Sequence, residues 1–179
     1  MKQSLAMQQL KIWDKSGRYV FTKHDIAKIF PSDSEKSLST SLNRLVKANI
    51  LQHACKGIYV NENAKSFRND TIERIAKALR PGEYNYISLE SMLSEYGVIS
   101  QIPIDRLTVM TTGRKGTYNT PYGTIEFTHT KRSTLDIIQS IYRAGDRPLR
   151  VATKETAWRD LKRVGRNISL VNEEELFNE

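Results

Sequence analysis

Residues 21–61, FTKHDIAKIFPSDSEKSLSTSLNRLVKANILQHACKGIYVN, contain the pattern that decides the fold of the first part of the chain. A short helical segment comes first and ends at Pro31, because the residue before a proline is disfavoured in the α conformation. A longer amphipathic helix is predicted over residues 34–48, and two short β-rich runs joined at Lys56–Gly57 follow it. The order of helix, turn, helix and hairpin is typical of a winged helix-turn-helix.

The two helices carry their own start signals. Thr22 followed three residues later by Asp25 resembles a capping box, with an aspartate in place of the usual Glu or Gln. Ser32 followed by Glu35 is a second such signature. Ser34 is a competing N-cap, and the spacing does not choose between the two serines.

The longer helix is predicted to have one apolar and one polar face. Leu38, Leu42, Leu45 and Val46 recur at helical spacing, which indicates a stripe that faces a core. The opposite face carries short hydroxyl and amide side chains with Arg and Lys, which can approach base edges and phosphates. An ordinary solvated face is the alternative interpretation. The side chains that we expect to contact DNA are Lys36, Ser37, Thr40, Ser41, Arg44 and Lys47 of the helix and Lys56 of the hairpin.

The hairpin is expected to form the wing. Residues 50–54 and 58–60 alternate like strands, and Gly57 supplies the positive φ of a tight turn. Lys56 stands at the tip, where it is expected to meet the phosphate backbone. His24 and His53 have no second ligand at metal-binding spacing and are expected to be packing or surface residues. We therefore expect neither a metal nor a cofactor.

Positive charge is concentrated in the same part of the chain. The 179 residues have a formal net charge of +8, and residues 1–68 hold 12 Lys/Arg against 5 Asp/Glu. Residues 69–179 hold 16 against 15. Basic side chains release counterions when they neutralise phosphates, so this module has a source of nucleic-acid affinity. Solubility alone is the other interpretation of the charge.

The composition places the protein in the soluble globular class. Hydrophobic residues make up 39% and charged residues 27% of the chain, and no apolar run approaches the roughly 20 residues of a membrane span. The first residues, MKQSLAMQQLKIW, lack the apolar core of a signal peptide. Cys55 is the single cysteine, so an internal disulfide is excluded. The expected location is the cytoplasm.

The chain is predicted to be an α+β protein of two domains. Residues 1–68 form the winged helix-turn-helix domain, and residues 69–179 form a mixed α/β domain with an antiparallel β-rich core. The acidic tail from residue 172 is expected to be loose. Helices are predicted over residues 2–14, 70–79, 88–96 and 154–164 and strands over 107–112, 117–120 and 124–130, while 137–142 fits a strand or a short helix.

The second domain shows no arrangement of residues that suggests catalysis. Residues 113–116, GRKG, lack the Lys-Ser/Thr pair of a phosphate-binding loop, and a hairpin turn explains them. His129 has no neighbouring nucleophile, and Glu155 and Asp160 are five residues apart on a helix and point to different sides. We therefore do not expect an enzyme. A basic helix end that could bind a protein or a nucleic acid is formed by Trp158, Arg159, Lys162, Arg163 and Arg166.

The motifs of the second half resemble the AbiEi-type antitoxins of bacterial type IV toxin–antitoxin pairs. The resemblance covers most of the chain and includes the segment YISLESMLSEYGVI over residues 86–99, the turn at 112–114 and the helix entry VATKE over 151–155. In that family the corresponding pieces are a YISLESALxxYGLI helix and an ASPEKAL-like helix start. Thr153 and Lys154 replace the usual Ser/Thr-Pro, so the match at this point is approximate.

The resemblance implies a function for each domain. In such proteins the N-terminal winged helix binds repeats in the promoter of its own operon and represses it, and a dimer on the DNA is possible. The C-terminal domain counters a partner toxin with a nucleotidyltransferase fold, in systems linked to phage resistance. The antitoxin itself is not a nucleotidyltransferase. The alternative is a winged helix that binds a protein partner without sequence-specific DNA binding, because a fold does not fix a function.

Overall fold

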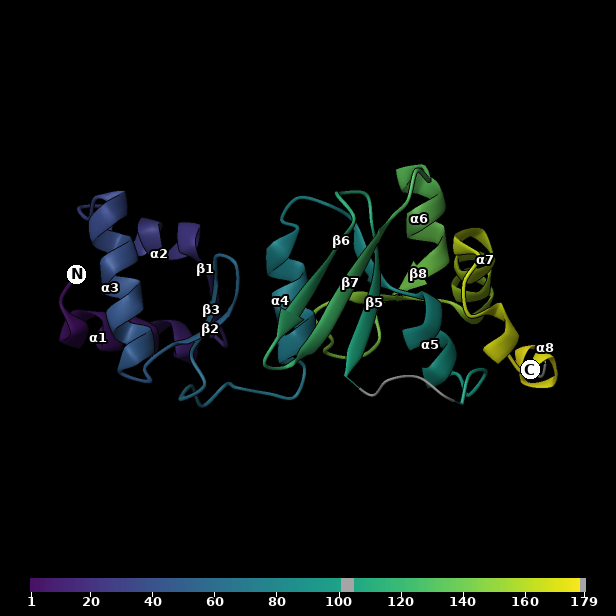
Figure 1. Ribbon diagram of the computed structural model, residues 1–179, viewed down its shortest axis with the longest axis horizontal. Helices are drawn as coiled ribbons and strands as arrows, with labels where there is room; N and C mark the ends of the chain where they lie inside the picture. Colours follow the sequence, from purple (N-terminus) through teal and green to yellow (C-terminus); the bar gives the residue numbers. More distant parts are fainter. Residues whose placement is uncertain (101–104, 178–179) are drawn as a thin grey trace. The chain divides into compact units, whose positions relative to one another are not determined.

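The computed structural model describes residues 1–100 and 105–177 and shows a mixed α+β protein with two sheets (Figure 1). The chain forms two compact units, residues 1–79 and 80–179. In the described residues, no helix is both long enough and apolar enough to cross a membrane. The first unit contains α1 (Gln3–Lys15), β1 (Val20–Thr22), α2 (Lys23–Ile29), α3 (Glu35–Lys47), β2 (Gln52–Cys55), β3 (Ile58–Val60) and α4 (Thr71–Leu79).

Side-chain caps begin both α2 and α3. The predicted capping box of α2 is confirmed, since the Asp25 amide donates to the Thr22 hydroxyl over 3.0 Å and the Thr22 amide donates to the Asp25 carboxylate over 2.8 Å. The structure also decides between the two candidate caps of α3. Ser34 is the N-cap, and its hydroxyl accepts a hydrogen bond of 3.2 Å from the Ser37 amide.

The core of the first unit lies between the helices and the small sheet. The expected stripe of α3 is buried at Leu38, Leu42 and Leu45. These leucines pack with Leu10 of α1 and Phe21 of β1 in one apolar cluster. Burying a leucine stabilises a fold by roughly 1.5–3 kcal/mol, so this contact holds α3 on the unit with its other face outward.

Strand β3 is the centre of a three-stranded antiparallel sheet in the order β1-β3-β2. Val60 pairs with Val20 on one side and with Gln52 on the other. The predicted hairpin is therefore present as β2 and β3, with Gly57 at a φ of +76° in the turn. Strand β1, just before α2, adds the third strand to this hairpin.

Helix α4 belongs to the first unit, so the division lies after Leu79 and not after residue 68. Tyr19 is completely buried, and its hydroxyl lies 3.0 Å from the Thr71 hydroxyl and 3.2 Å from an Asp70 carboxylate oxygen. The Arg74 guanidinium lies 5.1 Å from the centre of the Tyr19 ring. A buried phenol needs polar partners, and the start of α4 supplies them.

The second unit is built on a six-stranded sheet in the order β6-β7-β5-β4-β9-β8. Helix α5 packs on β5 and against α7, which in turn contacts β9. The elements of this unit are β4 (Asn85–Ile87), α5 (Leu89–Glu95), β5 (Arg106–Thr111), β6 (Gly116–Thr120), β7 (Gly123–His129), α6 (Thr134–Ser140), β8 (Ile141–Tyr142), β9 (Arg150–Ala152), α7 (Lys154–Val164), a 3₁₀ turn (Ile168–Leu170) and α8 (Glu173–Phe177).

The strand directions correct the expected antiparallel core. Three strand pairs are antiparallel, but β5 pairs with β7 and β4 pairs with β9 in parallel. Strand β5 is buried from Leu107 to Thr111, as is typical of an interior strand that is covered on both faces. The chain passes from β5 to the edge strand β6 and returns through β7 between them, which makes β5 and β7 parallel.

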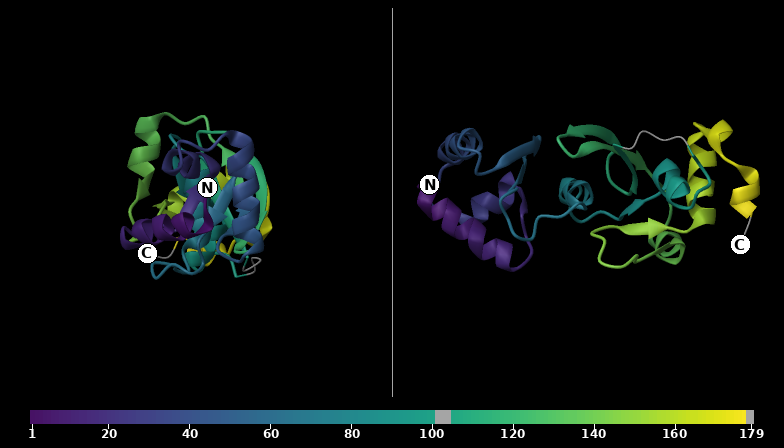
Figure 2. Two further views of the ribbon diagram at one scale, coloured as in Figure 1. Left: turned by 90° about the vertical axis from the view of Figure 1, so that its left-hand side faces the viewer. Right: turned by 90° about the horizontal axis from the view of Figure 1, so that it is seen from below.

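Two further segments of the second unit are ordered elements, and the second of them corrects the expectation of a loose tail. Residues 137–142, which fitted either a strand or a helix, belong to the end of α6 and to β8. The acidic tail forms α8 from Glu173 to Phe177, and its remaining residues, 178–179, lie outside the described part of the chain. Helix α8 follows α7 near the C-terminus (Figure 2), and the Lys154 ammonium donates to the Glu175 carbonyl over 3.4 Å.

A buried carboxylate joins α7 to the sheet. Asp160 has no exposed surface and accepts hydrogen bonds from the Ser88 hydroxyl at 2.8 Å and the Tyr86 hydroxyl at 3.2 Å. Arg132 lies 3.0 Å from its other oxygen. Burial raises the pKa of Asp160 despite these partners. Ser88 immediately precedes α5, but its side chain donates to Asp160 and makes no capping hydrogen bond to the helix.

Candidate nucleic-acid interface

Five of the predicted DNA-contacting residues lie on the exposed side of α3. The buried leucine stripe fixes the rotation of the helix and leaves the opposite side to solvent. The five exposed residues are Lys36, Ser37, Thr40, Arg44 and Lys47.

Ser41 does not belong to this exposed set. Its side chain is 2% exposed, and its hydroxyl accepts a hydrogen bond of 3.1 Å from Nη2 of Arg44. The predicted contact of Ser41 with a base is therefore not favoured, because its hydroxyl is buried and bound to Arg44. Ser41 stands three residues after Leu38 and four before Leu45, so helical spacing places it on the buried stripe.

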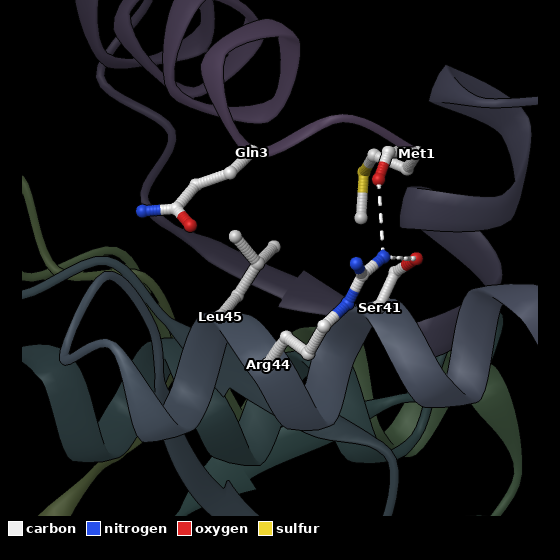
Figure 3. A pocket seen from close by; sticks show the side chains of 5 residues that line it. All are labelled: Met1, Gln3, Ser41, Arg44 and Leu45. Atoms are coloured by element: carbon white, nitrogen blue, oxygen red, sulfur yellow. Dashed lines mark hydrogen bonds between the residues drawn. The ribbon is translucent and has the colours of Figure 1, made fainter.

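Arg44 is held at the edge of the candidate interface (Figure 3). Its Nη2 donates to the Ser41 hydroxyl and, over 3.4 Å, to the carbonyl oxygen of Met1. The close-up shows the guanidinium between α3 and the segment that leads into α1, with Leu45 beside it. Arg44 is exposed, so these contacts preorient a cation that can be presented to an anionic partner.

The hydroxyls on α3 are partly engaged within the helix. Thr40 donates to the Lys36 carbonyl over 3.0 Å, and Ser39 donates to the Glu35 carbonyl over 2.9 Å. A hydroxyl oxygen that has given its proton can still accept. In this state Thr40 can accept a hydrogen bond from the amino group of adenine or cytosine in a major groove.

Lys23 is a contributor that the sequence did not indicate. Its ammonium lies 3.1 Å from the carboxylate of Glu35, in the first turn of α3. Glu35 is the single acid of the helix, and its side chain is 88% exposed. The pair offsets the negative charge that would otherwise repel phosphates at the start of α3.

The tip of the β2–β3 hairpin presents Lys56 to solvent. The turn is held to the start of α2, because the Lys23 amide donates to the Gly57 carbonyl over 2.8 Å. A cation on a braced turn loses less conformational freedom on binding than a cation on a loose loop. Lys56 is therefore suited to a phosphate contact.

The start of α2 contains an ionised carboxylate beside this turn. Burial opposes ionisation of Asp25, but hydrogen bonds from the Thr22 amide and hydroxyl and the nearby Arg18 guanidinium outweigh it and lower its pKa. Arg18 lies 2.8 Å from the carboxylate. These bonds need the ionised form of Asp25, so the stability of the start of α2 depends on the pH of the solution.

The two histidines of the first unit lie as expected for surface or packing residues. His24 is exposed, and the His53 ring lies 5.2 Å from the ring of Tyr59. Within residues 1–100 and 105–177, no three His, Cys, Asp or Glu side chains are grouped closely enough to hold a metal ion.

An open pocket lies in the second unit, at the turn between β5 and β6. It is lined by both acidic and basic side chains, and Nδ1 of His129 lies 2.8 Å from the Gly113 carbonyl oxygen. The Thr112 hydroxyl donates to the Glu83 carboxylate over 2.5 Å. The lining residues are Glu83, Thr112, Gly113, Arg114, Lys115 and His129, and they include neither a serine nor a cysteine nucleophile.

Comparison with models of protein families gives no match for this chain, and comparison with curated proteins gives none either. The resemblance to AbiEi-type antitoxins is therefore an expectation that rests on the sequence motifs alone.

Proposed function

We propose that this protein is a cytoplasmic transcriptional repressor that binds double-stranded DNA in its own promoter and acts as the antitoxin of a type IV toxin–antitoxin pair. In this proposal the first unit is a winged helix-turn-helix, α3 enters the major groove and the β2–β3 hairpin is the wing. The partner of the second unit is a toxin with a nucleotidyltransferase fold.

The exposed face of α3 is the observation that carries the DNA-binding part. It places three cations and two hydroxyls on one side of a helix whose other side is fixed in a core. Hydroxyls near the N-terminal end suit base edges, and the cations suit guanine or phosphate. These side chains are Lys36, Ser37, Thr40, Arg44 and Lys47.

Charge supports the same assignment. Residues 1–79 hold 14 Lys/Arg against 7 Asp/Glu, whereas residues 80–179 hold 14 against 13. The excess of positive charge belongs to the unit that presents α3 and Lys56. Counterion release from DNA would therefore favour binding through this unit.

The antitoxin part has support of a different kind. It rests on the motif resemblance, above all on YISLESMLSEYGVI over residues 86–99, which forms β4, α5 and the turn that follows. The compact second unit supplies a surface for a partner that is separate from α3.

Two assays in cells test the two parts of the proposal. A reporter gene behind the DNA upstream of the protein's own gene should be repressed by the protein and released by Arg44→Ala. Expression of the product of a neighbouring reading frame should arrest growth, and the protein should restore it. Unchanged reporter output contradicts the repressor, and growth arrest that the protein does not relieve contradicts the antitoxin.

The alternative function is a winged helix that binds a protein and no specific DNA. It predicts an unrepressed reporter together with a complex that persists as salt rises. The excess charge of the first unit argues against this alternative, because a surface for a neutral partner does not need it.

A further inference from the structure

A groove between α7 and α8 is not used by the DNA-binding proposal. It encloses about 520 Å³, within the roughly 300–1,000 Å³ range of ligand sites in proteins. Its lining combines apolar and basic side chains, including Trp158 and Lys162 of α7 and Leu176 and Phe177 of α8. Helices α7 and α8, which line the groove, belong to the second unit and lie near the C-terminus (Figure 1).

The spacing of α7 places the basic and aromatic residues on one face. Lys154, Trp158 and Lys162 follow one another at intervals of four, while Ala157 and Leu161 are buried on the adjoining side of the helix. The Thr153 hydroxyl caps the helix by accepting from the Thr156 amide. This row, which is half-buried at Lys154 and Trp158 and exposed at Lys162, is thus part of a well-defined helix.

The apolar side of the groove is incompletely covered. Phe177 is 75% exposed and Trp158 is half-buried, although both line the same hollow. Leu176 is buried beside them and anchors α8. Burying an exposed phenylalanine and the open part of a tryptophan removes apolar surface from water and would therefore favour binding of an apolar side chain.

Two cations flank this apolar surface and contact neutral groups. The Lys162 ammonium lies 5.0 Å from the centre of the Trp158 ring, and Nη2 of Arg159 donates to the Ser140 hydroxyl over 3.2 Å. These contacts orient both side chains without neutralising them. Arg166 is different, because its guanidinium bridges the carboxylates of Glu90 and Glu126.

The acids near the groove decide between two kinds of anionic partner. The first turn of α8 holds three exposed glutamates, 173–175, and Glu155 is a further acid in the groove lining. Hydrogen bonds from its own amide and from Thr153 lower the pKa of Glu155. These carboxylates repel a continuous polyanion such as a nucleic acid, whereas a protein segment can place individual acids beside Arg159 and Lys162.

We propose that the groove between α7 and α8 docks a segment of a partner protein that carries a large apolar side chain flanked by carboxylates. The apolar side chain covers Trp158 and Phe177, and the carboxylates pair with Arg159 and Lys162. The identification of this partner as the toxin rests on the proposed function. The predicted chemistry of the docked segment rests on the groove alone.

The test uses the full chain with Trp13→Phe, which leaves Trp158 as the single tryptophan and therefore as the reporter. The probe is a synthetic amphipathic peptide with Leu and Phe at helical spacing and Glu at the other positions. A second peptide has Lys in place of every Glu. We expect the glutamate peptide to shift the Trp158 emission saturably and to bind at least tenfold more tightly than the lysine peptide.

Variants locate the binding. Arg159→Glu with Lys162→Glu should weaken binding of the glutamate peptide roughly tenfold or more, because two attractions become repulsions. Phe177→Ala should weaken it as well, and because Phe177 is 75% exposed the substitution removes groove surface and leaves the buried core intact. Arg143→Glu, an exposed charge reversal elsewhere in the unit, is the matched control and should leave binding unchanged.

Several outcomes overturn the inference. They are no binding of the glutamate peptide, equal binding of both peptides, or loss of binding in Arg143→Glu alone. Tighter, Arg159-dependent binding of a single-stranded oligonucleotide would assign the groove to nucleic acid instead. Because peptide binding is read from Trp158 and DNA binding from labelled promoter DNA, a failure of one proposal is distinguishable from a failure of the other.

Discussion

Nη2 of Arg44 donates a hydrogen bond of 3.1 Å to the hydroxyl of Ser41, one turn earlier on α3. Ser41 is buried and Arg44 is exposed, so the hydrogen bond to the buried serine fixes the position of the exposed guanidinium. We therefore expect the exposed polar residues of α3 to contact DNA directly, and we expect Ser41 to act by positioning Arg44. This difference gives the DNA-binding proposal a specific energetic test.

Arg44→Ala should weaken binding to the cognate site by about 1–3 kcal/mol, because an arginine that reads guanine makes two hydrogen bonds. Affinity for a scrambled duplex should fall much less. Equilibrium anisotropy with both duplexes measures the two losses, and Arg143→Ala is the control from the second unit. Unchanged affinity for the cognate site removes Arg44 from the interface.

Ser41→Ala should act on DNA binding only through Arg44. Alone it should lower cognate affinity less than Arg44→Ala does, and it should have no further effect when Arg44 is already alanine. Thr40→Ala, on the exposed face, should instead add to Arg44→Ala. A double-mutant cycle measures both couplings. A full additional loss from Ser41→Ala in the Arg44→Ala background would show that Ser41 itself contacts the DNA.

Lys56→Ala should weaken binding to every sequence by a similar factor. A wing lysine that contacts phosphate reads no base, and removing it should lower the slope of log K against log salt by about one unit. Titrations at several salt concentrations with cognate and scrambled duplexes measure this slope. A loss confined to the cognate duplex would contradict the wing assignment.

The Asp25 carboxylate at the start of α2 should make the stability of the first unit decrease in acid. The pKa of Asp25 is lower in the folded protein than its ordinary value near 3.8, so its contribution to stability is present above that value. The contribution is lost as the pH falls through the folded pKa, below about 4. Thr22→Ala should lower the free energy of unfolding by about 1 kcal/mol at neutral pH. It should also reduce the acid limb, which is the decrease in stability as the pH falls below about 4.

Thermal unfolding of the wild type and of Thr22→Ala between pH about 2 and 7 measures both effects. The exposed strand residue Thr117 provides the matched control, Thr117→Ala, which should leave the acid limb unchanged. An acid limb of equal slope in all three proteins would show that another carboxylate is responsible.

Asp160→Asn should destabilise the second unit by about 3–5 kcal/mol, because it leaves the nearly buried Arg132 without its counter-charge. Replacing both partners, with Asp160→Asn and Arg132→Met, should recover part of this loss. Denaturant unfolding measures each free energy, and the exposed Asp146→Asn is the control. A loss below about 1 kcal/mol for Asp160→Asn would mean that water reaches Arg132 and compensates the charge.

Local signals explain which parts of the fold could be predicted. The capping box at Thr22 and the leucine stripe of α3 depend on residues three or four apart, and both are present as expected. The residue type of Ser41 predicts a place on the polar face, although its spacing from Leu38 and Leu45 fits the buried stripe. Spacing decides burial in a helix, and a small hydroxyl can be accommodated in it.

Long-range pairings explain what could not be predicted. The parallel pairing of β5 with β7 depends on the path of the chain through β6, which no periodicity encodes. The bond from Ser88 to Asp160 joins residues 72 positions apart, so no local pattern around Ser88 indicates it. The ion pair of Lys23 with Glu35 likewise needs α2 and α3 to be packed together.

The most direct test of the central claim is fluorescence anisotropy with labelled DNA from immediately upstream of the protein's own gene. A scrambled duplex of the same length and composition is titrated beside it over a series of salt concentrations. The account predicts a preference for the upstream DNA that persists as salt rises, because base contacts from α3 do not depend on counterion release. Equal binding of both duplexes that collapses steeply with salt would contradict it and leave only a basic surface.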